Sequence, residues 1–570
     1  MTETVYDMVI LGAGSGGYAA ALRGAQLGLK VALIEADKLG GTCLHRGCVP
    51  TKALLHAAET ADAVREAAAV GIKAAFEGVD MPGVQKYKNS IVSRMHKGLE
   101  GLVSSRGIDL IQGWGRLVAA DVVEVDGRRI TGRNVVLASG SYSKTIGQEI
   151  SGGVITSEEA LEMDHVPASA VILGGGVIGV EFASAWASMG SQVTIIEGLP
   201  HLVPNEDEAI SKQLERAFRK RKITFRTNTM FESVERHDGG VTVRTQDGKT
   251  HEAEVLLIAV GRGPATANLG YEEVGVAMDR GFVLADEYGR TNVPGVWAVG
   301  DIVPGVQLAH RGFAQGIVVA EKIAGLDPTP VDDVLVPKVT FCEPEIASVG
   351  LSEAKAAEIH GKENITSAEF NVAGNAKSQI LGTQGFVKLV SLKDGPILGF
   401  HAIGARMGEQ VGEGQLMVSW EADADDVAAL VIQAHGAGTE ALPLRSGVTR
   451  ASMLHWQLRE VNRLAGAVKS QAYSGYSSNS AASGVSAASA PATRSAQSVA
   501  SAYSGYSAGS AASVYSPASV VPSAAEASAA RSLLEDTPIS EVSSQPVAGL
   551  LPSAPSPEAD AAETSAATAV

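Results

Sequence analysis

Two stretches of the chain share one pattern of apolar and polar positions. Residues 4–37 and 168–198 each hold a short β-branched apolar run, a glycine cluster, an alanine-rich helical pattern and a second apolar run that ends in glutamate. A strand, a helix and a second strand of these lengths are typical of a parallel βαβ unit. The sequence therefore predicts two such units, and with them two dinucleotide sites.

The segments between and after these units follow other patterns. Residues 52–106 read mostly as helix, and residues 108–137 alternate as strands do. Residues 331–400 alternate again, with helices expected near 352–359 and 421–433. We expect a separate mixed domain in this last region.

Composition narrows the class of protein. The 570 residues are 45% hydrophobic and 19% charged, which is ordinary for a globular protein. The net charge of −17 opposes a general nucleic-acid binder, and three cysteines are too few for a disulfide-stapled scaffold. Neither a signal peptide nor a membrane-spanning apolar run is recognisable, so we expect no membrane association and a cytoplasmic location.

The composition changes near residue 470. Residues 469–570 are dominated by alanine and serine, and such a segment cannot bury enough apolar surface to offset chain entropy. We expect a disordered, low-complexity tail. A short motif recurs in it, at 472–477 and 502–507, and two interpretations stay open: low-complexity drift, or a Tyr/Ser contact segment for a partner.

The first glycine cluster fits the dinucleotide pattern G-x-G-x-x-G. Gly12 makes the tight turn, Gly14 lets the backbone approach a pyrophosphate, and Gly17 permits close helix–strand packing. Phosphates then lie at a helix N-terminus, where free N–H groups favour anions. Glu35 ends the second strand, where it can accept hydrogen bonds from a ribose.

The second cluster repeats the arrangement with Gly174, Gly176, Gly179 and Glu197. An acidic residue at that strand end repels a 2′-phosphate, and residues 198–201 contain no arginine to bind one. The pattern favours NAD over NADP.

The segment GGTCLHRGCVPTK, residues 40–52, carries two thiols at the start of a predicted helix. A helix start can bring Cys43 and Cys48 within disulfide distance and raise their thiolate population. A metal site would need further ligands, and only His45 lies nearby, so we expect none. Two buried, inert thiols are the other alternative. Cys342, in an apolar strand, is predicted to be buried and inert.

A dinucleotide fingerprint followed by this thiol segment resembles the pyridine nucleotide–disulfide oxidoreductases, and most of all the members that oxidise dihydrolipoyl groups. The resemblance covers residues 5 to about 440, nearly all of the predicted folded part. Further matching segments lie at 138–141, 259–264, 295–301 and 344–350. Ser139 stands where the family usually has threonine.

The resemblance implies a role for each matching residue. Cys43 would exchange with the substrate, Cys48 would lie against the flavin, and Lys52 would lie near the flavin with Glu181 as its partner. Besides the fingerprint residues, the implied cofactor contacts are Gly41, Thr42, Gly115, Ser139, Gly140, Gly261, Arg262, Asp301 and Ala309.

The family's catalytic base is a histidine, oriented by a glutamate and acting on the disulfide of the other subunit. His435 and Glu440 match this pair, and a histidine that titrates near neutrality suits the role. Two departures are visible: Gly436 replaces the family's proline, and the residues from Pro443 onward no longer match.

The predicted fold class is α/β, with two Rossmann-like domains for FAD and NAD, a C-terminal α+β dimerisation domain and a disordered tail. We expect five regions along the chain: an FAD-binding domain (1–150), an NAD-binding domain (151–275), a central domain that completes the FAD site (276–335), an interface domain (336–468) and the tail (469–570).

The resemblance implies that a homodimer oxidises a protein-bound dihydrolipoyl dithiol and passes electrons through FAD to NAD⁺. Expected partners are the lipoyl domain of an acyltransferase, or the lipoyl protein of glycine cleavage, and a complex core subunit. Three alternatives stay open: a glutathione- or mercuric-reductase-like enzyme, a transhydrogenase-like relative that the two cysteines oppose, and a catalytically impaired flavoprotein that acts as a binding subunit.

Overall fold

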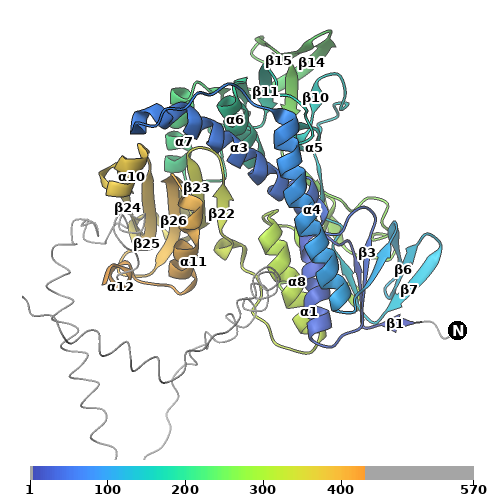
Figure 1. The fold of residues 1–570 in the computed structure, drawn as a ribbon. Helices are drawn as coiled ribbons and strands as arrows, with labels where there is room; N and C mark the ends of the chain where they lie inside the picture. Colours follow the sequence, from blue (N-terminus) through green and yellow to red (C-terminus); the bar gives the residue numbers. More distant parts are fainter. Residues whose placement is uncertain (1–3, 430–570) are drawn as a thin grey trace, which may run out of the picture. The chain divides into compact units, whose positions relative to one another are not determined.

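The computed structural model describes residues 4–429 (Figure 1). The first glycine cluster follows a strand of a five-stranded parallel sheet. Strands in the order β21-β8-β2-β3-β4 form the sheet: Val296–Ala298, Val135–Leu137, Met8–Leu11, Val31–Glu35 and Asp109–Gln112. Helix α1 (Ser15–Gln26) connects β2 to β3 and packs on α8 (Ala309–Ile323). A Cβ atom at Gly316 would lie 2.2 Å from the Gly16 carbonyl oxygen, so the pair depends on glycine.

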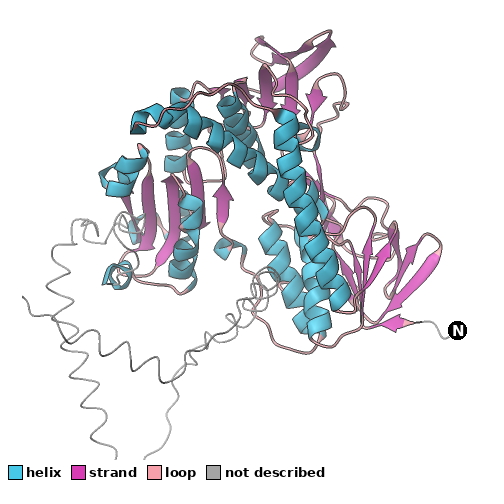
Figure 2. Ribbon diagram, in the orientation of Figure 1, coloured by secondary structure: helices cyan, strands magenta, loops and turns pink. Residues whose placement is uncertain are grey.

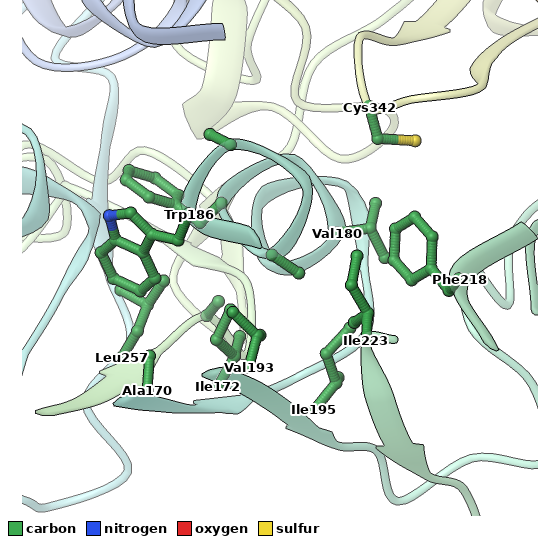
Figure 3. Packing of buried hydrophobic residues seen from close by; sticks show 14 of the residues in the cluster. Ala170, Ile172, Val180, Trp186, Val193, Ile195, Phe218, Ile223, Leu257 and Cys342 are labelled. Atoms are coloured by element: carbon green, nitrogen blue, oxygen red, sulfur yellow. The ribbon is translucent and has the colours of Figure 1, made fainter. Parts of the chain in front are cut away.

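The second glycine cluster lies on a second five-stranded parallel sheet. Its order is β10-β17-β11-β12-β13, with bounds Val154–Ile155, Val255–Ile258, Ser169–Leu173, Gln192–Ile196 and Thr224–Arg226. Helix α6 (Val177–Met189) follows β11, and α7 (Glu208–Lys220) lies between β12 and β13. Figure 3 shows side chains of the sheet, among them Ile172 and Val193, packed beneath Val180 and Trp186 of α6.

A third five-stranded sheet is antiparallel and lies in the region where a separate mixed domain was expected (Figure 2). Its order is β22-β23-β26-β25-β24, with bounds Lys338–Thr340, Glu345–Gly350, Ile397–Gly404, Phe386–Leu392 and Ile365–Asn371. Four helices accompany these strands: α9 (Glu353–His360), α10 (Ala376–Leu381), α11 (Val411–Ser419) and α12 (Ala424–Ala429). The helix expected near 352–359 is confirmed, and α12 matches the one expected near 421–433 from Ala424 to the last described residue, 429.

Smaller sheets complete the described part. The sheet β1-β7-β6-β5 comprises Val5–Tyr6, Arg128–Gly132, Val122–Val125 and Gly115–Ala119. The sheet β14-β15-β16 comprises Phe231–His237, Gly240–Thr245 and Thr250–Ala253. Two-stranded pairs are formed by β9 with β18 and by β19 with β20, at Ser141–Ser143, Arg262–Pro264, Met278–Asp279 and Phe282–Val283.

The region predicted as helix over 52–106 is divided. Helices α2 (Gly41–His45), α3 (Cys48–Glu66) and α4 (Met81–Ser105) are present, with the 3₁₀ turn η1 (Ala67–Val70) after α3. Residues 71–80 contain no helix, and the region is mostly helical, as predicted. Gly71, at φ +82°, ends the helical stretch because glycine adopts the left-handed conformation without strain. Short elements α5 (Ser157–Ala160), η2 (Gly300–Ile302), η3 (Asp333–Leu335), η4 (Lys362–Asn364), η5 (Val372–Gly374) and η6 (Met407–Glu409) lie in connections.

Among the helices that the structure describes, none has the length and apolar character needed to cross a membrane. The domain boundaries given above stay predictions.

A buried charged cluster joins α7 to the antiparallel sheet. Asp207, only 2% exposed, caps α7 by accepting a hydrogen bond from the Ala209 amide. The Lys388 ammonium of β25 lies 2.8 Å from Asp207 and 2.7 Å from Glu353. Burial opposes the charge, yet the hydrogen bond from Lys388 keeps the pKa of Asp207 lowered.

The Lys388→Met variant should lose about 3–5 kcal/mol of stability, because removing one partner leaves the Asp207 carboxylate buried and unpaired. Thermal unfolding measures the loss. The Lys355→Met variant is the control, since its ammonium pairs at the surface with Glu358 and should matter by less than about 1 kcal/mol. Equal melting of the two variants would contradict the account.

Candidate functional site

The first glycine cluster forms a cradle between β2 and α1. Gly12 has φ +105°, and a Cβ atom there would lie 2.3 Å from the Ala138 carbonyl oxygen. A Cβ atom at Gly17 would lie 1.8 Å from the Gly12 oxygen, whereas one at Gly14 would meet no atom within 4 Å. Backbone is therefore packed tightly below the turn and open at Gly14, where a pyrophosphate can approach the N-terminus of α1.

The second cradle repeats this geometry. A Cβ atom at Gly174 would lie 2.4 Å from the Ala259 oxygen, and one at Gly179 would lie 1.9 Å from the Gly174 oxygen. Gly176 again faces open space. Two segments of different sequence thus form the same anion-binding turn.

The acidic residues at the strand ends are held alike. The Glu35 carboxylate accepts hydrogen bonds from the amides of Ala13 (2.8 Å) and Asp37 (2.9 Å). The Glu197 carboxylate accepts from the amides of Gly175 (2.6 Å) and Leu199 (2.8 Å). Each carboxylate is fixed beside its glycine turn, where its free lone pairs can accept a ribose hydroxyl.

The remaining predicted cofactor residues gather around the first cradle. A Cβ atom at Gly41, where α2 begins with Gly41 and Thr42, would lie 2.7 Å from the Gly14 Cα. The Ser139 amide is close to Gly12, and the Ser139 hydroxyl accepts a hydrogen bond from Tyr271. The other members are Gly115 at the start of β5, Gly140 at φ +77°, Asp301 in η2 and Ala309 at the start of α8.

A polar network ties three of these segments together. The Ser141 hydroxyl donates to Asp301 (2.5 Å), and Arg262 donates to the hydroxyls of Ser141 (2.7 Å) and Ser143 (3.0 Å). Gly261, at φ +99°, lies between Arg262 and the backbone of Ala259, which packs against Gly174. Residues 259–262 therefore lie next to both cradles.

The two thiols lie at the junction of α2 and α3. Cys43 is half-buried in α2, Cys48 is the first residue of α3, and both are free thiols in the structure. Cys48 is exposed, and the hydrogen bond from Cys43 lowers its pKa to about 7, with help from the Lys52 ammonium. The same contact raises the pKa of Cys43. The pair is therefore asymmetric, with the negative charge favoured on Cys48.

Lys52 and Glu181 form an ion pair between α3 and α6. The Lys52 ammonium lies 3.0 Å from both carboxylate oxygens of Glu181, which is only 3% exposed. The Phe341 amide donates a third hydrogen bond to Glu181, 2.9 Å long, and the Lys52 ammonium lies 4.6 Å from the Phe341 ring centre. The predicted pairing of Lys52 with Glu181 is present, and Phe341 adds a cation–π contact.

Sequence reasoning missed Phe341 as a neighbour of this pair. Its signal was its place directly before the buried Cys342 and the segment 344–350. The Cys342 thiol is 1% exposed and donates to the Pro344 carbonyl, so the prediction of a buried thiol is confirmed. His435 and Glu440 lie outside the described residues, so their roles stay predictions.

The geometry fits FAD at the first cradle and NAD at the second. Both cradles have an open glycine at a helix N-terminus, a carboxylate fixed at the end of the following strand and tight backbone packing beneath. The thiol pair is close to the first cradle. Gly41, the first residue of α2, packs against Gly14, and Cys43 and Cys48 follow in α2 and at the start of α3.

Comparison with known proteins agrees. The family described as "Pyridine nucleotide-disulphide oxidoreductase" matches residues 6–316, and its dimerisation domain matches residues 336–444. A dihydrolipoyl dehydrogenase of Bacillus subtilis is 37% identical over 72% of this chain and 91% of its own length. A dihydrolipoyl dehydrogenase of Rhizobium etli is 39% identical over 71% of this chain and 90% of its own length.

Two solved structures share the fold. LpdA from Mycobacterium tuberculosis covers 79% of this chain and 99% of its own, with a TM-score of 0.71 at 24% identity. The HOCl-induced flavoprotein disulfide reductase RclA from Escherichia coli covers 77% of this chain and 98% of its own, with a TM-score of 0.69 at 28% identity.

These matches confirm the predicted α/β fold with its dimerisation domain, the resemblance and the two cofactors, FAD and NAD(H). The tail predicted at 469–570 lies outside the described residues. The matched dimerisation domain supports a homodimer. On these grounds the chain belongs to the pyridine nucleotide-disulphide oxidoreductase family and is a flavin-dependent enzyme.

Proposed function

We propose that this enzyme oxidises the dihydrolipoyl group of a carrier protein and delivers the two electrons to NAD⁺. The observation that carries the proposal is the placement of the thiol pair: Cys43 lies in α2, Cys48 starts α3, and Lys52, paired with Glu181, lies one turn further along the same helix. These surroundings lower the pKa of Cys48. The curated relatives named dihydrolipoyl dehydrogenase support this activity and favour none of the alternatives.

The oxidised enzyme has a Cys43–Cys48 disulfide. One substrate thiolate attacks the Cys43 sulfur, forming a mixed disulfide and releasing Cys48 as a thiolate. The second substrate thiolate attacks the substrate sulfur of the mixed disulfide and releases Cys43, so the substrate leaves as a cyclic disulfide. Two electrons are thereby held on Cys43 and Cys48, and FAD, when bound, supplies the route by which they pass to NAD⁺.

Charge and proton are divided between the two cysteines. The Lys52 ammonium and the Cys43 thiol stabilise the Cys48 thiolate, whereas Cys43 keeps its proton. A general base must therefore take a proton from the substrate dithiol near Cys43. We assign this role to His435 of the partner subunit, oriented by Glu440, on the strength of the sequence motif.

We propose the lipoyl domain of an acyltransferase, or the lipoyl protein of glycine cleavage, as the substrate carrier and a complex core subunit as a further partner. We place the enzyme in the cytoplasm. The cofactor contacts named above stay part of this proposal, with Glu197 setting the preference for NAD.

The Cys43→Ser variant should lose dihydrolipoamide turnover by at least about a thousandfold, because the exchange sulfur is absent. Cys342→Ala is the matched control, since Cys342 is buried and has no role in the mechanism; its turnover should stay within about twofold. Steady-state rates with dihydrolipoamide and NAD⁺ measure both. Normal turnover by Cys43→Ser would overturn the disulfide assignment.

The Glu197→Arg variant should shift the ratio of kcat/KM for NAD⁺ over NADP⁺ by about a hundredfold toward NADP⁺, because a guanidinium replaces a carboxylate at the 2′ position. Glu197→Gln is the control and should weaken NAD⁺ binding without improving that of NADP⁺. An unchanged ratio in Glu197→Arg would count against a ribose contact at this residue.

The His435→Gln variant should slow reduction by dihydrolipoamide by about a hundredfold or more while transfer from NADH to a dye stays near normal, because only the thiol step needs the base. Stopped-flow absorbance follows the first rate. His165→Gln is the control, as His165 bridges Asp164 and Glu254 at the surface. Equal slowing of both reactions would mean that His435 is not the base.

A further inference from the structure

One face of α6 carries a row of polar side chains that lead away from the Lys52–Glu181 pair. Glu181, Ser184 and Ser188 lie at spacings of three and four residues, so they share that face. Ser184 and Ser188 are almost completely buried. Buried hydroxyls need partners, and both have them.

Arg221, directly after α7, supplies those partners. Its guanidinium donates to the Ser184 hydroxyl (2.8 Å), the Ser188 hydroxyl (2.5 Å) and the Asp62 carboxylate of α3 (2.9 Å). It also donates to the Glu343 carbonyl oxygen (2.9 Å). A single side chain, about one-fifth exposed, therefore binds three elements.

Further contacts close the cluster. The Ser188 hydroxyl donates to Asp62 (2.5 Å), and Arg65 donates to Asp62 (3.0 Å) and to the Ser188 carbonyl oxygen. We call Asp62, Arg65, Ser184, Ser188 and Arg221 the Arg221 cluster.

The Arg221 cluster and the Lys52–Glu181 pair join the same three elements at two levels. At one level, Lys52 of α3, Glu181 of α6 and the Phe341 amide meet. One turn along α6, the Ser184 hydroxyl accepts from both Arg221 and the Glu343 amide (2.9 Å). Each helix is rigid over about 5–15 Å. The Arg221 cluster therefore restrains α3, α6 and residues 341–343 from sliding past one another at the Lys52–Glu181 pair as well.

We propose that Arg221 is a positioning residue for the reaction: through Asp62, Ser184 and Ser188 it sets the register of α3 against α6. That register sets where the Glu181 carboxylate, and the Lys52 ammonium that it holds, lie relative to the Cys48 sulfur. This proposal rests on the proposed roles of Cys48 and Lys52. Arg221 touches neither residue, and it acts through the helices that carry them.

The consequence is electrostatic. Four groups act on the charge of Cys48 or respond to it: Cys43 of α2, Lys52 of α3, Glu181 of α6 and Arg262 of β18. Lys52 favours the thiolate and Glu181 opposes it, and both effects depend on distance. A slide of α3 along α6 moves the Glu181 carboxylate relative to Cys48 and draws the Lys52 ammonium that it holds with it, so the balance of the two effects changes although both groups remain.

The test is a pH titration of the reduced holoenzyme. A Cys48 thiolate lying against oxidised flavin gives a long-wavelength absorbance, and its pH midpoint reports the thiolate pKa. Arg221→Met should raise this midpoint by about half a pH unit, which lowers the ratio of thiolate to thiol at a given pH by roughly threefold. Arg221→Lys, which keeps the charge and part of the hydrogen bonding, should recover part of the shift.

Arg219→Met is the matched control. Arg219 lies two residues away on α7, is mostly exposed, and contacts Glu215 and Phe225 rather than the cluster. Its midpoint should equal that of the unmodified enzyme. If the Arg221→Met variant does not bind FAD, the Ser188→Ala variant tests the proposal instead. It removes only the hydroxyl that joins Arg221 to Asp62, and it should shift the midpoint in the same direction.

The outcomes separate the two proposals. No long-wavelength absorbance in the unmodified enzyme would overturn the role given to Cys48 and leave the proposed function without its thiol site. That absorbance in the unmodified enzyme, with an unshifted midpoint in Arg221→Met and in Ser188→Ala, would overturn the role of Arg221 alone. A lower melting temperature without a shifted midpoint would also overturn it, since the cluster would then be structural only.

Discussion

The buried carboxylate of Glu181 is the constraint around which the thiol site is built. A carboxylate that is 3% exposed must be neutralised and hydrogen-bonded, since an unpaired buried charge costs several kcal/mol. Lys52 supplies the charge and the Phe341 amide supplies a further donor, so that with Glu181 itself three segments far apart in the sequence meet. Satisfying Glu181 therefore brings α3, α6 and the start of the antiparallel sheet together, and places an ammonium near Cys48.

The same arrangement gives the thiol pair its direction. Cys43 and Cys48 have identical side chains, and only their surroundings distinguish them. Cys48 receives a hydrogen bond and the field of Lys52, whereas Cys43 donates and keeps its proton. A pair polarised in this way can exchange with substrate at one sulfur and hold charge at the other, as an electron relay between a dithiol and a flavin requires.

The features that depend on neighbouring residues alone, such as turns and helix ends, could be predicted from the sequence. The glycine turns were predictable because only glycine tolerates the backbone approach at Gly12 and Gly174, and the strand-end acids followed from the same pattern. Residues 52–106 are mostly helical, as their pattern predicts, and the break at 71–80 begins at Gly71, which adopts the left-handed conformation that ends a helix. The resemblance, not spacing, pointed to the pairing of Lys52 with Glu181.

Contacts between distant elements could not be predicted in this way. Phe341 at the ion pair, Arg221 between α3 and α6, and Lys388 on Asp207 each depend on how separate elements pack, which no periodicity encodes. His435 and Glu440 lie outside the described residues and stay predictions from the motif.

The central claim is that one thiol pair links the substrate to FAD and NAD⁺. An anaerobic titration of the purified enzyme with dihydrolipoamide, followed by NAD⁺, tests it most directly. The account predicts a long-wavelength absorbance from the Cys48 thiolate against the flavin, discharged by NAD⁺ with formation of NADH. A flavin spectrum that dihydrolipoamide leaves unchanged, but that NADH bleaches, would contradict it.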